Sequence, residues 1–329
     1  MTKTILVTGG CGFIGSNFLR YIREKEDWRI INIDKLTYAG ASWLSLGLVG
    51  EYFFTQSDIG NSKVVKEILN RYRPDYIVNF AAETHVDRSI DNPHAFLDTN
   101  VVSTYNFIEE VQRYYDTENA EVRFVHISTD EVYGSLTPEM PSFTEETPYK
   151  PRNPYSATKA FGDHLISAFN NTYKLPAIIT NCSNNYGPYQ FPEKFIPVVI
   201  LNAFQNKPVP VYGTGSNIRD WIYVRDHCTA VYNVCLNGKI GDKYNIGSRN
   251  EVDNLTLAKK ILQIMGKPES LIKFVEDRKG HDLRYSMDST KIRKELGWKE
   301  ETDFDGGLEQ TVKWYHDNMG WVNKCLHSE

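Results

Sequence analysis

The stretch Thr4-Ile5-Leu6-Val7-Thr8-Gly9-Gly10-Cys11-Gly12-Phe13-Ile14-Gly15 decides how this chain folds. Its first five residues form a short run typical of a buried strand, and glycines follow at positions 9, 12 and 15. That spacing lets the backbone turn tightly, approach a pyrophosphate and pack a helix on the strand. The helix expected over residues 13–25 would point N–H groups and the positive end of its dipole at the phosphates. The motif therefore predicts a dinucleotide site, and the alternative is a tight turn without a ligand.

An acidic partner for this loop stands at the end of the next expected strand. Asp34 follows Gly15 by nineteen residues, and a carboxylate there can accept hydrogen bonds from both ribose hydroxyls of an adenosine. It would also repel a 2′-phosphate, so NAD is favoured over NADP. Lys35 follows directly and weakens this preference slightly. Asp58 and Ile59 end the third expected strand, where an adenine edge could be met.

Short apolar runs alternate with amphipathic segments in the first half of the chain. Strands are expected at residues 4–8, 29–33, 52–55, 75–80, 122–127 and 177–180, and helices at 13–25, 62–71, 93–115 and 154–173. Continuous apolar strands separated by helices are typical of a parallel sheet covered on both faces. A wholly helical chain is excluded because the apolar runs are too short and too rich in Ile and Val. We therefore expect an α/β fold with a Rossmann-type, doubly wound parallel sheet.

The character of the sequence changes after about residue 181. Prolines and aromatic residues become frequent, and helices are expected at 255–265 and 289–296. The expected organisation is an NAD-binding domain over residues 1–181 and a smaller α+β, mainly substrate-binding domain over 182–329, some of whose segments can return to the first. A cleft between the two is the natural ligand site.

Composition narrows the class of protein. The 329 residues include 37 Lys and Arg against 42 Asp and Glu, so the net charge is −5 and gives no general attraction to nucleic acid or anionic lipid. No run of eighteen apolar residues suggests a membrane span, and Gly9 and Gly10 interrupt the first apolar stretch before a secretory leader could form. Five cysteines without a C-x-x-C pair favour reduced thiols in a cytoplasmic protein, with no metal site.

A candidate catalytic pair lies on the helix expected at 154–173. Tyr155 and Lys159 are four residues apart and share one face of that helix. A lysine ammonium, together with the positive nicotinamide of NAD⁺, would stabilise the phenolate and lower the pKa of the tyrosine. The pair gains meaning from Ser128-Thr129-Asp130-Glu131-Val132-Tyr133-Gly134, which follows the fifth strand at the edge where parallel sheets bind ligands. Two adjacent carboxyls there suggest acid–base chemistry, and a solvated loop is the alternative.

Together these motifs resemble the extended short-chain dehydrogenase/reductase superfamily and, within it, the dTDP-glucose 4,6-dehydratase family. The matching stretches cover most of the chain, at residues 9–15, 34–40, 81–89, 128–134, 155–159, 184–190, 219–221 and 277–285. The narrower match rests on Thr129-Asp130-Glu131, because epimerases and decarboxylases of this superfamily generally lack an Asp-Glu pair there. The resemblance implies an NAD-dependent hydro-lyase that converts dTDP-glucose to dTDP-4-keto-6-deoxyglucose and water. The reaction would proceed by transient oxidation at C4, elimination across C5 and C6, and hydride return to C6.

The resemblance also implies a role for each catalytic residue. Tyr155 would take the C4 hydroxyl proton, and Glu131 would take the C5 proton. Asp130 would protonate the departing C6 hydroxyl. Thr129 would hydrogen-bond the C4 oxygen, and Lys159 would hold the nicotinamide ribose and tune the tyrosine. The sequence alone leaves open which of the two carboxyls keeps a proton at rest.

Cofactor and substrate contacts are implied in the same way. The cofactor set is Gly9, Gly12, Phe13, Ile14, Gly15, Asp34, Lys35, Thr37, Asp58, Ile59, Ala81, Ala82, Thr99, Tyr155, Lys159 and Asn185. The substrate set is Thr84, Thr129, Asn184, Lys194, Phe195, Pro210, Tyr212, Arg219, Asn254, Arg278 and His281. Arg219 is the strongest phosphate candidate because guanidinium binds phosphate in a bidentate fork. His281 could instead form a surface pair with Asp282.

Other functions stay open at this point. A 4-epimerase or decarboxylase would share Tyr155 and Lys159 but would have no use for both Asp130 and Glu131. A UDP-glucose 4,6-dehydratase differs only in the base, and a binding protein that keeps NAD as a structural ligand would need no catalytic set. The resemblance further implies a homodimer formed through the helices at 93–115 and 154–173.

Overall fold

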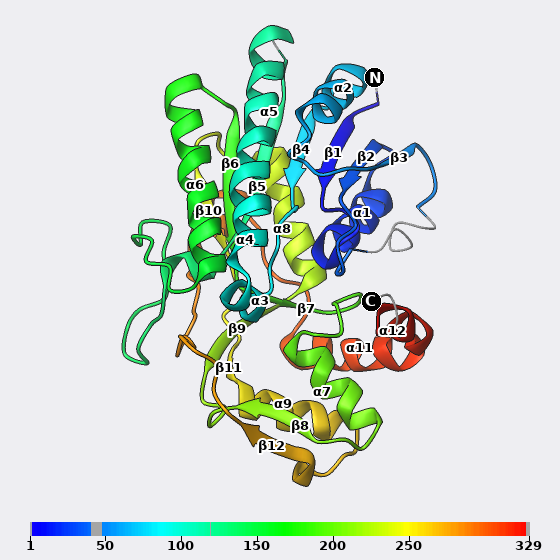
Figure 1. The fold of residues 1–329 in the computed structure, drawn as a ribbon, viewed down its shortest axis with the longest axis vertical. Helices are drawn as coiled ribbons and strands as arrows, with labels where there is room; N and C mark the ends of the chain where they lie inside the picture. Colours follow the sequence, from blue (N-terminus) through cyan, green and yellow to red (C-terminus); the bar gives the residue numbers. More distant parts are fainter. Residues whose placement is uncertain (1, 41–47, 119, 327–329) are drawn as a thin grey trace.

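The computed structural model describes residues 2–40, 48–118 and 120–326. Its centre is a seven-stranded sheet in which all neighbouring strands are parallel, in the order β10-β6-β5-β4-β1-β2-β3 (Figure 1). The strands are β1 (Thr4–Thr8), β2 (Arg29–Asp34), β3 (Tyr52–Gln56), β4 (Tyr76–Asn79), β5 (Arg123–Thr129), β6 (Ala177–Cys182) and β10 (Lys243–Ile246). The order reverses between β1 and β4, which is where sheets of this kind bind ligands. The expected fold class is confirmed.

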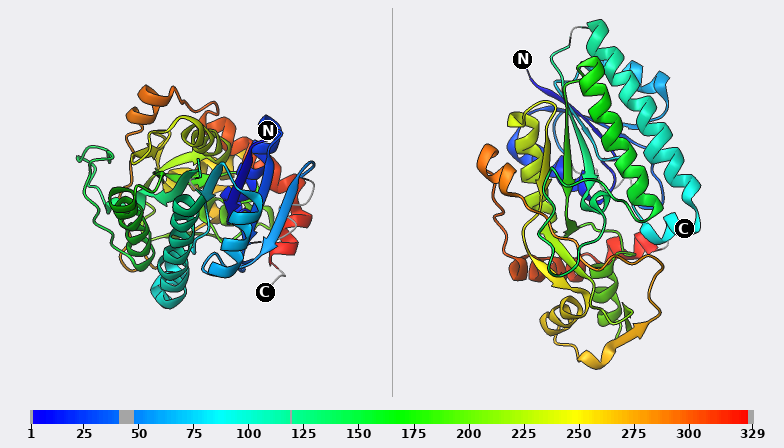
Figure 2. Two further views of the ribbon diagram at one scale, coloured as in Figure 1. Left: turned by 90° about the horizontal axis from the view of Figure 1, so that it is seen from above. Right: turned by 90° about the vertical axis from the view of Figure 1, so that its left-hand side faces the viewer.

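Helices cover both faces of this sheet because its strands are apolar on both sides. On β1, Ile5 and Val7 pack into one apolar layer while Leu6 packs into the other. The first layer includes α1 (Phe13–Lys25) and α8 (Val224–Asn237), and the second includes α2 (Ser62–Tyr72), α5 (Thr104–Glu118) and α6 (Pro154–Tyr173). Figure 2 shows α5 and α6 side by side on one face of the sheet.

The helix expected at 93–115 is less regular than the sequence indicates. After the short α3 (Val86–Asp91), the chain forms α4 (Pro93–Phe96), a wide π-helical segment η2 (Leu97–Ser103) and then α5. Within η2, Asn100 exchanges two hydrogen bonds with the backbone of Glu83 and donates a third to the Thr158 hydroxyl, 3.0 Å away. These bonds tie η2 to the segment after β4 and to α6, both of which border the ligand edge of the sheet.

The second region lies beyond the carboxyl ends of the parallel strands (Figure 1). A three-stranded sheet joins β7 (Asn184–Tyr186), β9 (Ile218–Tyr223) and β11 (Glu251–Asp253), and β8 (Val209–Tyr212) pairs with β12 (Ile272–Val275). Its other elements are α7 (Phe195–Phe204), α9 (Asn254–Ile264), α11 (Phe304–Asp317) and α12 (Met319–Leu326), with a 3₁₀ turn at η4 (Glu269–Leu271). A second 3₁₀ turn, η3 (Asp130–Tyr133), directly follows β5 of the large sheet. Buried side chains such as Val199, Leu257, Leu308 and Tyr315 form its core. None of the helices in the described part of the chain has the length and apolar surface that crossing a bilayer requires.

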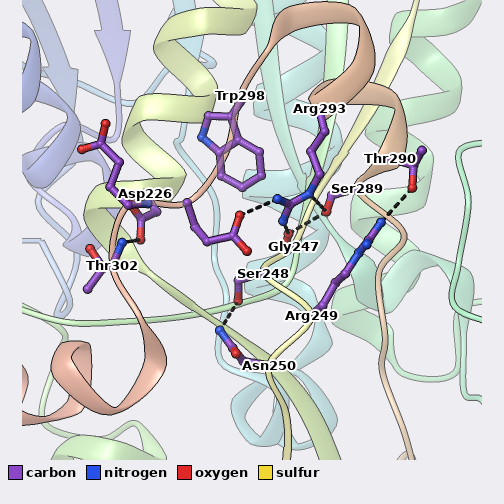
Figure 3. A network of polar contacts seen from close by, with 12 residues as sticks. Asp226, Gly247, Ser248, Arg249, Asn250, Ser289, Thr290, Arg293, Trp298 and Thr302 are labelled. Atoms are coloured by element: carbon purple, nitrogen blue, oxygen red, sulfur yellow. Dashed lines mark hydrogen bonds and ion pairs between the residues drawn. The ribbon is translucent and has the colours of Figure 1, made fainter.

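Two elements that follow residue 182 belong to the large sheet. β10 extends it beyond β6, and α8 packs against α1, β5 and β6. The helix α10 (Thr290–Leu296), which comes after α9 in the chain, packs against β10 and α8 and is held there by the polar contacts in Figure 3. There Arg293 lies 2.6 Å from the Glu300 carboxylate, donates to the Ser289 hydroxyl at 3.1 Å and covers the ring of Trp298.

Replacing this arginine should loosen the attachment of α10. We expect Arg293→Met to lower the free energy of unfolding by about 1–2 kcal/mol, since it removes charge-assisted hydrogen bonds that are only partly exposed to water. Urea unfolding measures the change. Lys294→Met on the exposed face of the same helix is the control, and an equal loss in both variants would contradict this account.

Candidate active site

A cleft of about 490 Å³ lies between the carboxyl edge of the large sheet and the second region. Its volume suits a ligand site. Every residue that the sequence singled out as catalytic, cofactor-binding or substrate-binding lines this cleft. The chain thus brings together residues that are more than 270 positions apart, from Gly9 to His281.

The glycine loop leaves space where the sequence predicts a pyrophosphate. Gly9 has a φ of +68°, a conformation that side-chain-bearing residues rarely adopt. A Cβ on Gly15 would lie only 2.2 Å from the carbonyl oxygen of Gly9, so the helix can approach the loop only without one. Gly12 precedes α1 and gives it no side-chain cap, which leaves N–H groups of the first turn for a ligand. The loop therefore fits a dinucleotide.

The acidic residue after β2 is held by the same loop. Asp34 accepts hydrogen bonds at 2.8 Å from the backbone N–H groups of Cys11 and Leu36. Burial raises the pKa of its carboxyl, while these two bonds favour the ionised form. The Lys35 ammonium lies 2.8 Å from the carboxylate of Asp58. Its charge, which on sequence grounds slightly weakened the preference for NAD over NADP, is therefore paired with an anion.

The two adjacent carboxyls follow β5 on η3. Thr129 caps this turn, because its hydroxyl accepts from the Glu131 N–H at 3.3 Å and donates to Asp130 at 3.2 Å. Asp130 is 1% exposed, and one of its oxygens has no hydrogen-bond partner among the described residues. Glu131 is less buried and accepts a bond from the side-chain amide of Asn153 at 3.1 Å. The neighbours therefore differ in how well they satisfy a charge.

This difference separates the proton affinities of the pair. Burial, then the charges of Glu131 and Asp220, raise the pKa of Asp130 well above its ordinary value. Burial also raises the pKa of Glu131, but the Asn153 hydrogen bond and the cations Arg278 and Arg219 oppose the rise. These surroundings favour a proton on Asp130 more than on Glu131.

Tyr155 and Lys159 enter the cleft from the first turns of α6. Asn153 caps this helix reciprocally with Ser156, and Pro154 occupies its first position, where a missing N–H costs nothing. The Lys159 ammonium donates to the carbonyl oxygen of Ile127 at 2.7 Å. Burial and the charge of Glu131 raise the pKa of Tyr155 well above its ordinary value, although a hydrogen bond with Thr129 opposes this. The lowering expected from Lys159 is therefore not achieved by the side chains of the protein alone.

Basic residues line the far side of the cleft. The Arg219 guanidinium is 5% exposed, lies 4.2 Å above the Tyr285 ring and donates to the carbonyl oxygen of Asp282 at 3.0 Å. The imidazole of His281 bonds to Asp277 at 2.6 Å, so the alternative of a surface pair with Asp282 does not hold. Asp282 instead pairs with Arg152 at 2.8 Å.

The remaining predicted substrate residues complete that side. Lys194 donates to the carbonyl oxygen of Thr84 at 3.2 Å, and the amide oxygen of Asn184 is buried without a partner in the described chain. Tyr212 is 40% exposed at the end of β8 and meets the His281 ring edge-on. Basic groups together with an exposed aromatic ring suit a phosphorylated ligand with a planar base.

Sequence reasoning missed a cluster at the rim of the cleft. Glu193 accepts a hydrogen bond from the Tyr38 hydroxyl at 2.9 Å and lies within 3.6 Å of His85 and Arg88. The Arg88 guanidinium covers the Tyr38 ring at 3.5 Å. The four residues stand in or beside stretches that carried the family resemblance, but their spacing gave no sign that they meet. They join the segment after β2, the helix α3 and the loop before α7.

Comparisons with known proteins agree with this geometry. A family model described as GDP-mannose 4,6 dehydratase matches residues 6–311. The dTDP-glucose 4,6-dehydratases of Salmonella typhimurium and Neisseria meningitidis are each 48% identical to this chain, over 97% and 99% of it and 94% and 96% of their own lengths. The dTDP-glucose 4,6-dehydratase of Streptomyces venezuelae, solved with NAD bound, superposes with a TM-score of 0.92 at 40% identity over 98% of this chain and 99% of its own. A UDP-glucose 4-epimerase from Thermotoga maritima is also similar, at a TM-score of 0.87 and 26% identity over 96% of this chain and 99% of its own.

The raised pKa of Asp130 has a consequence for stability. The folded chain keeps a proton that the unfolded chain releases, so the stabilising contribution of this group is complete below the ordinary pKa and declines as the pH rises. Asp130→Asn, which cannot ionise, should therefore melt at a higher temperature than the natural chain, and the gain should be larger at about pH 8 than at about pH 5. Calorimetry at both values measures it. A gain that is independent of pH would show that Asp130 is not protonated in the folded chain.

Proposed function

Since the chain belongs to the dTDP-glucose 4,6-dehydratase family of nucleotide-sugar enzymes, we propose that its cleft converts dTDP-glucose to dTDP-4-keto-6-deoxyglucose and water. The observation that carries this proposal is the pair of carboxyls at the end of β5, in which Asp130 is 1% exposed with one oxygen unpartnered among the described residues, while Glu131 accepts a hydrogen bond from Asn153. Burial raises the pKa of Asp130 strongly, and the bond from Asn153 opposes the rise at Glu131. An elimination needs one acid and one base at neighbouring carbons, and this pair supplies both. Epimerisation at C4 would need neither.

We propose that NAD is the resident cofactor, held by the glycine loop, Asp34 and Lys159. Bound NAD⁺ supplies the acceptor for the C4 hydride and, once reduced, the donor that completes the reaction at C6. The chain's own groups manage the protons. Tyr155 takes the proton of the C4 hydroxyl, with Thr129 bonded to the same oxygen.

The ketone at C4 makes the C5 hydrogen acidic, and Glu131 removes it. Asp130 then gives its proton to the C6 hydroxyl, which leaves as water. Because Asp130 is 1% exposed, its proton is guarded from bulk solvent until the leaving group is in place. Glu131 then returns its proton to C5, and C6 receives the hydride from the reduced cofactor. Tyr155 still holds the proton from the C4 hydroxyl and Asp130 has lost its own, so the starting state requires that Tyr155 releases a proton and Asp130 takes one up, through solvent once the product has left.

The two regions divide the ligand between them in this proposal. Residues 1–181 bind NAD and carry the catalytic groups, whereas residues from 182 onwards mainly bind the nucleotide. Lys194, Arg219, Arg278 and His281 face the diphosphate, and Pro210 with Tyr212 meets the base. The names of the relatives support thymine over uracil for that base. A 4-keto-6-deoxy product suits the synthesis of deoxy sugars such as rhamnose, and the five buried thiols suit a reducing cytoplasm.

We also propose that two copies pair through η2, α5 and α6. Large apolar side chains are exposed along these neighbouring elements: Leu97 (45%), Val102 (53%), Tyr105 (40%), Phe161 (39%) and Tyr173 (53%). Joining such faces would remove this apolar surface from water. Light scattering should give twice the mass of one chain, and Val102→Glu with Phe161→Glu should halve that value. A monomeric natural chain would contradict the proposal.

Incubation with dTDP-glucose tests the activity directly. The natural chain should release a 4-keto-6-deoxy product, detected by mass spectrometry, without added NAD. Glu131→Gln should form no product but should still allow substrate to reduce the bound cofactor, because C4 oxidation precedes removal of the C5 proton. The absorbance of NADH follows this step. Conversion of dTDP-glucose to dTDP-galactose, or full turnover by Glu131→Gln, would overturn the proposal.

A further inference from the structure

A third ionisable residue lies behind Tyr155 and Lys159 on α6. Asp163 follows Lys159 by four residues, so it shares their helix face one turn deeper in the protein. Its carboxyl is 1% exposed and accepts hydrogen bonds from the Ser128 hydroxyl at 2.8 Å and the Asn181 amide at 3.1 Å. The carboxyl is thus attached to both β5 and β6 where they reach the cleft. None of the proposed chemical steps uses it.

A chain of buried polar groups leads across the sheet to the same carboxyl. The Thr8 hydroxyl donates to the side-chain oxygen of Asn79, which leaves the Asn79 amide nitrogen to donate to Nδ1 of His126 at 3.1 Å. This assigns the imidazole hydrogen to Nε2, which lies 3.8 Å from an oxygen of Asp163. Within the described chain neither of these last two atoms has a hydrogen-bond partner. A side chain at Gly162 would crowd the ring, since its Cβ would lie 3.2 Å from Nε2.

The charges in this layer follow from burial. Burial and the nearby Lys159 hold the pKa of His126 well below its ordinary value, so the ring is neutral. Burial also lowers the pKa of Lys159, and the charge of Asp163 opposes that effect. Burial raises the pKa of Asp163, while Lys159 and its hydrogen-bond donors restrain the rise. Lys159 and Asp163 therefore each favour the charged form of the other.

The other titratable groups that face these two are neutral. Cys182 on β6 faces Lys159, and burial raises the pKa of its thiol to about 12. Tyr133 and Tyr149, from the segment between β5 and α6, face Asp163, and burial raises the pKa of both phenols. Asp163 is accordingly the anion that balances Lys159 in this layer.

We propose that Asp163 is a positioning residue, whose carboxylate keeps Lys159 charged and fixes α6 against the ends of β5 and β6 so that Lys159 can support the phenolate of Tyr155. This inference rests on the proposed function, because it assumes that Tyr155 acts as the base. By this proposal, the buried polar groups behind the cleft help to set the pH range in which Tyr155 acts as a base.

Two variants separate charge from shape. Asp163→Asn keeps the shape and loses the charge, so the acid limb of the kcat/KM profile should move up by roughly one pH unit and the rate at neutral pH should fall about tenfold. Asp163→Glu keeps the charge, so its limb should stay near that of the natural chain even if kcat falls. An unmoved limb in Asp163→Asn, or an equal shift in both variants, overturns the proposal.

A milder variant and a second readout serve if Asp163→Asn does not fold. Ser128→Ala removes one donor to the carboxyl and should move the same limb upward by less. A second measurement needs no substrate: the ultraviolet absorbance of phenolate in the purified holoenzyme is followed as the pH is raised. The Tyr155 signal is the difference between each protein and the same protein that also carries Tyr155→Phe. The Tyr155 signal should shift to higher pH in Ser128→Ala, and an unshifted signal contradicts the proposal. If the natural chain forms no product but the Tyr155 signal still shifts in Ser128→Ala, the proposed reaction is rejected and the role of Asp163 stands.

Discussion

Removal of water from the carboxyl edge of the parallel sheet is the condition on which the rest of this structure depends. Asp130, Tyr155 and Lys159 are each less than 10% exposed, because the second region covers the edge where the strands end. Desolvation disfavours the charged form of each group, so it raises the pKa of the acid and of the phenol and lowers that of the lysine. Hydrogen bonds and neighbouring charges then decide which groups ionise. Two carboxyls that are adjacent in the chain thereby come to differ in their surroundings, as the proposed acid and base require.

The same condition explains why many polar groups behind the cleft are linked by hydrogen bonds. A buried carboxylate, imidazole or amide that lacks partners destabilises the fold, and each added partner must itself be satisfied. The hydrogen bonds from Thr8 to Asn79 and from Asn79 to His126, and those from Ser128 and Asn181 to Asp163, meet part of this requirement across several strands. The hydrogen bonds to Asp163 also hold α6 against β5 and β6, and they thereby orient Tyr155 and Lys159 on the same helix.

Local patterns in the sequence were sufficient to predict the large sheet apart from β10, the glycine loop, and the place of Tyr155 and Lys159 on one face of α6. Gly9, Gly12 and Gly15 act within one turn, and Tyr155 and Lys159 share a helix face by spacing alone, so no distant contact is needed to recognise them. Contacts that depend on the shape of a loop or on how distant segments pack were not predictable in this way. His281 has Asp282 beside it in sequence, yet it bonds to Asp277, and the meeting of Tyr38 with Glu193 depends on how two regions pack. The raised pKa of Asp130 likewise follows from burial and from the charges of Glu131 and Asp220, and the spacing of the sequence did not show that Asp220 lies near it.

The participation of β10 and α8 in the large sheet affects how the chain can reach its native state during synthesis. A nascent chain that has emerged only as far as β6 presents an open strand edge where β10 will later pair. It also exposes the apolar face, including Val125 and Ile178, that Val231 and Val234 of α8 will cover. Such an edge invites association with other chains. The large sheet can therefore be completed only after β10, about three quarters of the way along the polypeptide, has left the ribosome, and the unpaired edge is open to misassociation until then.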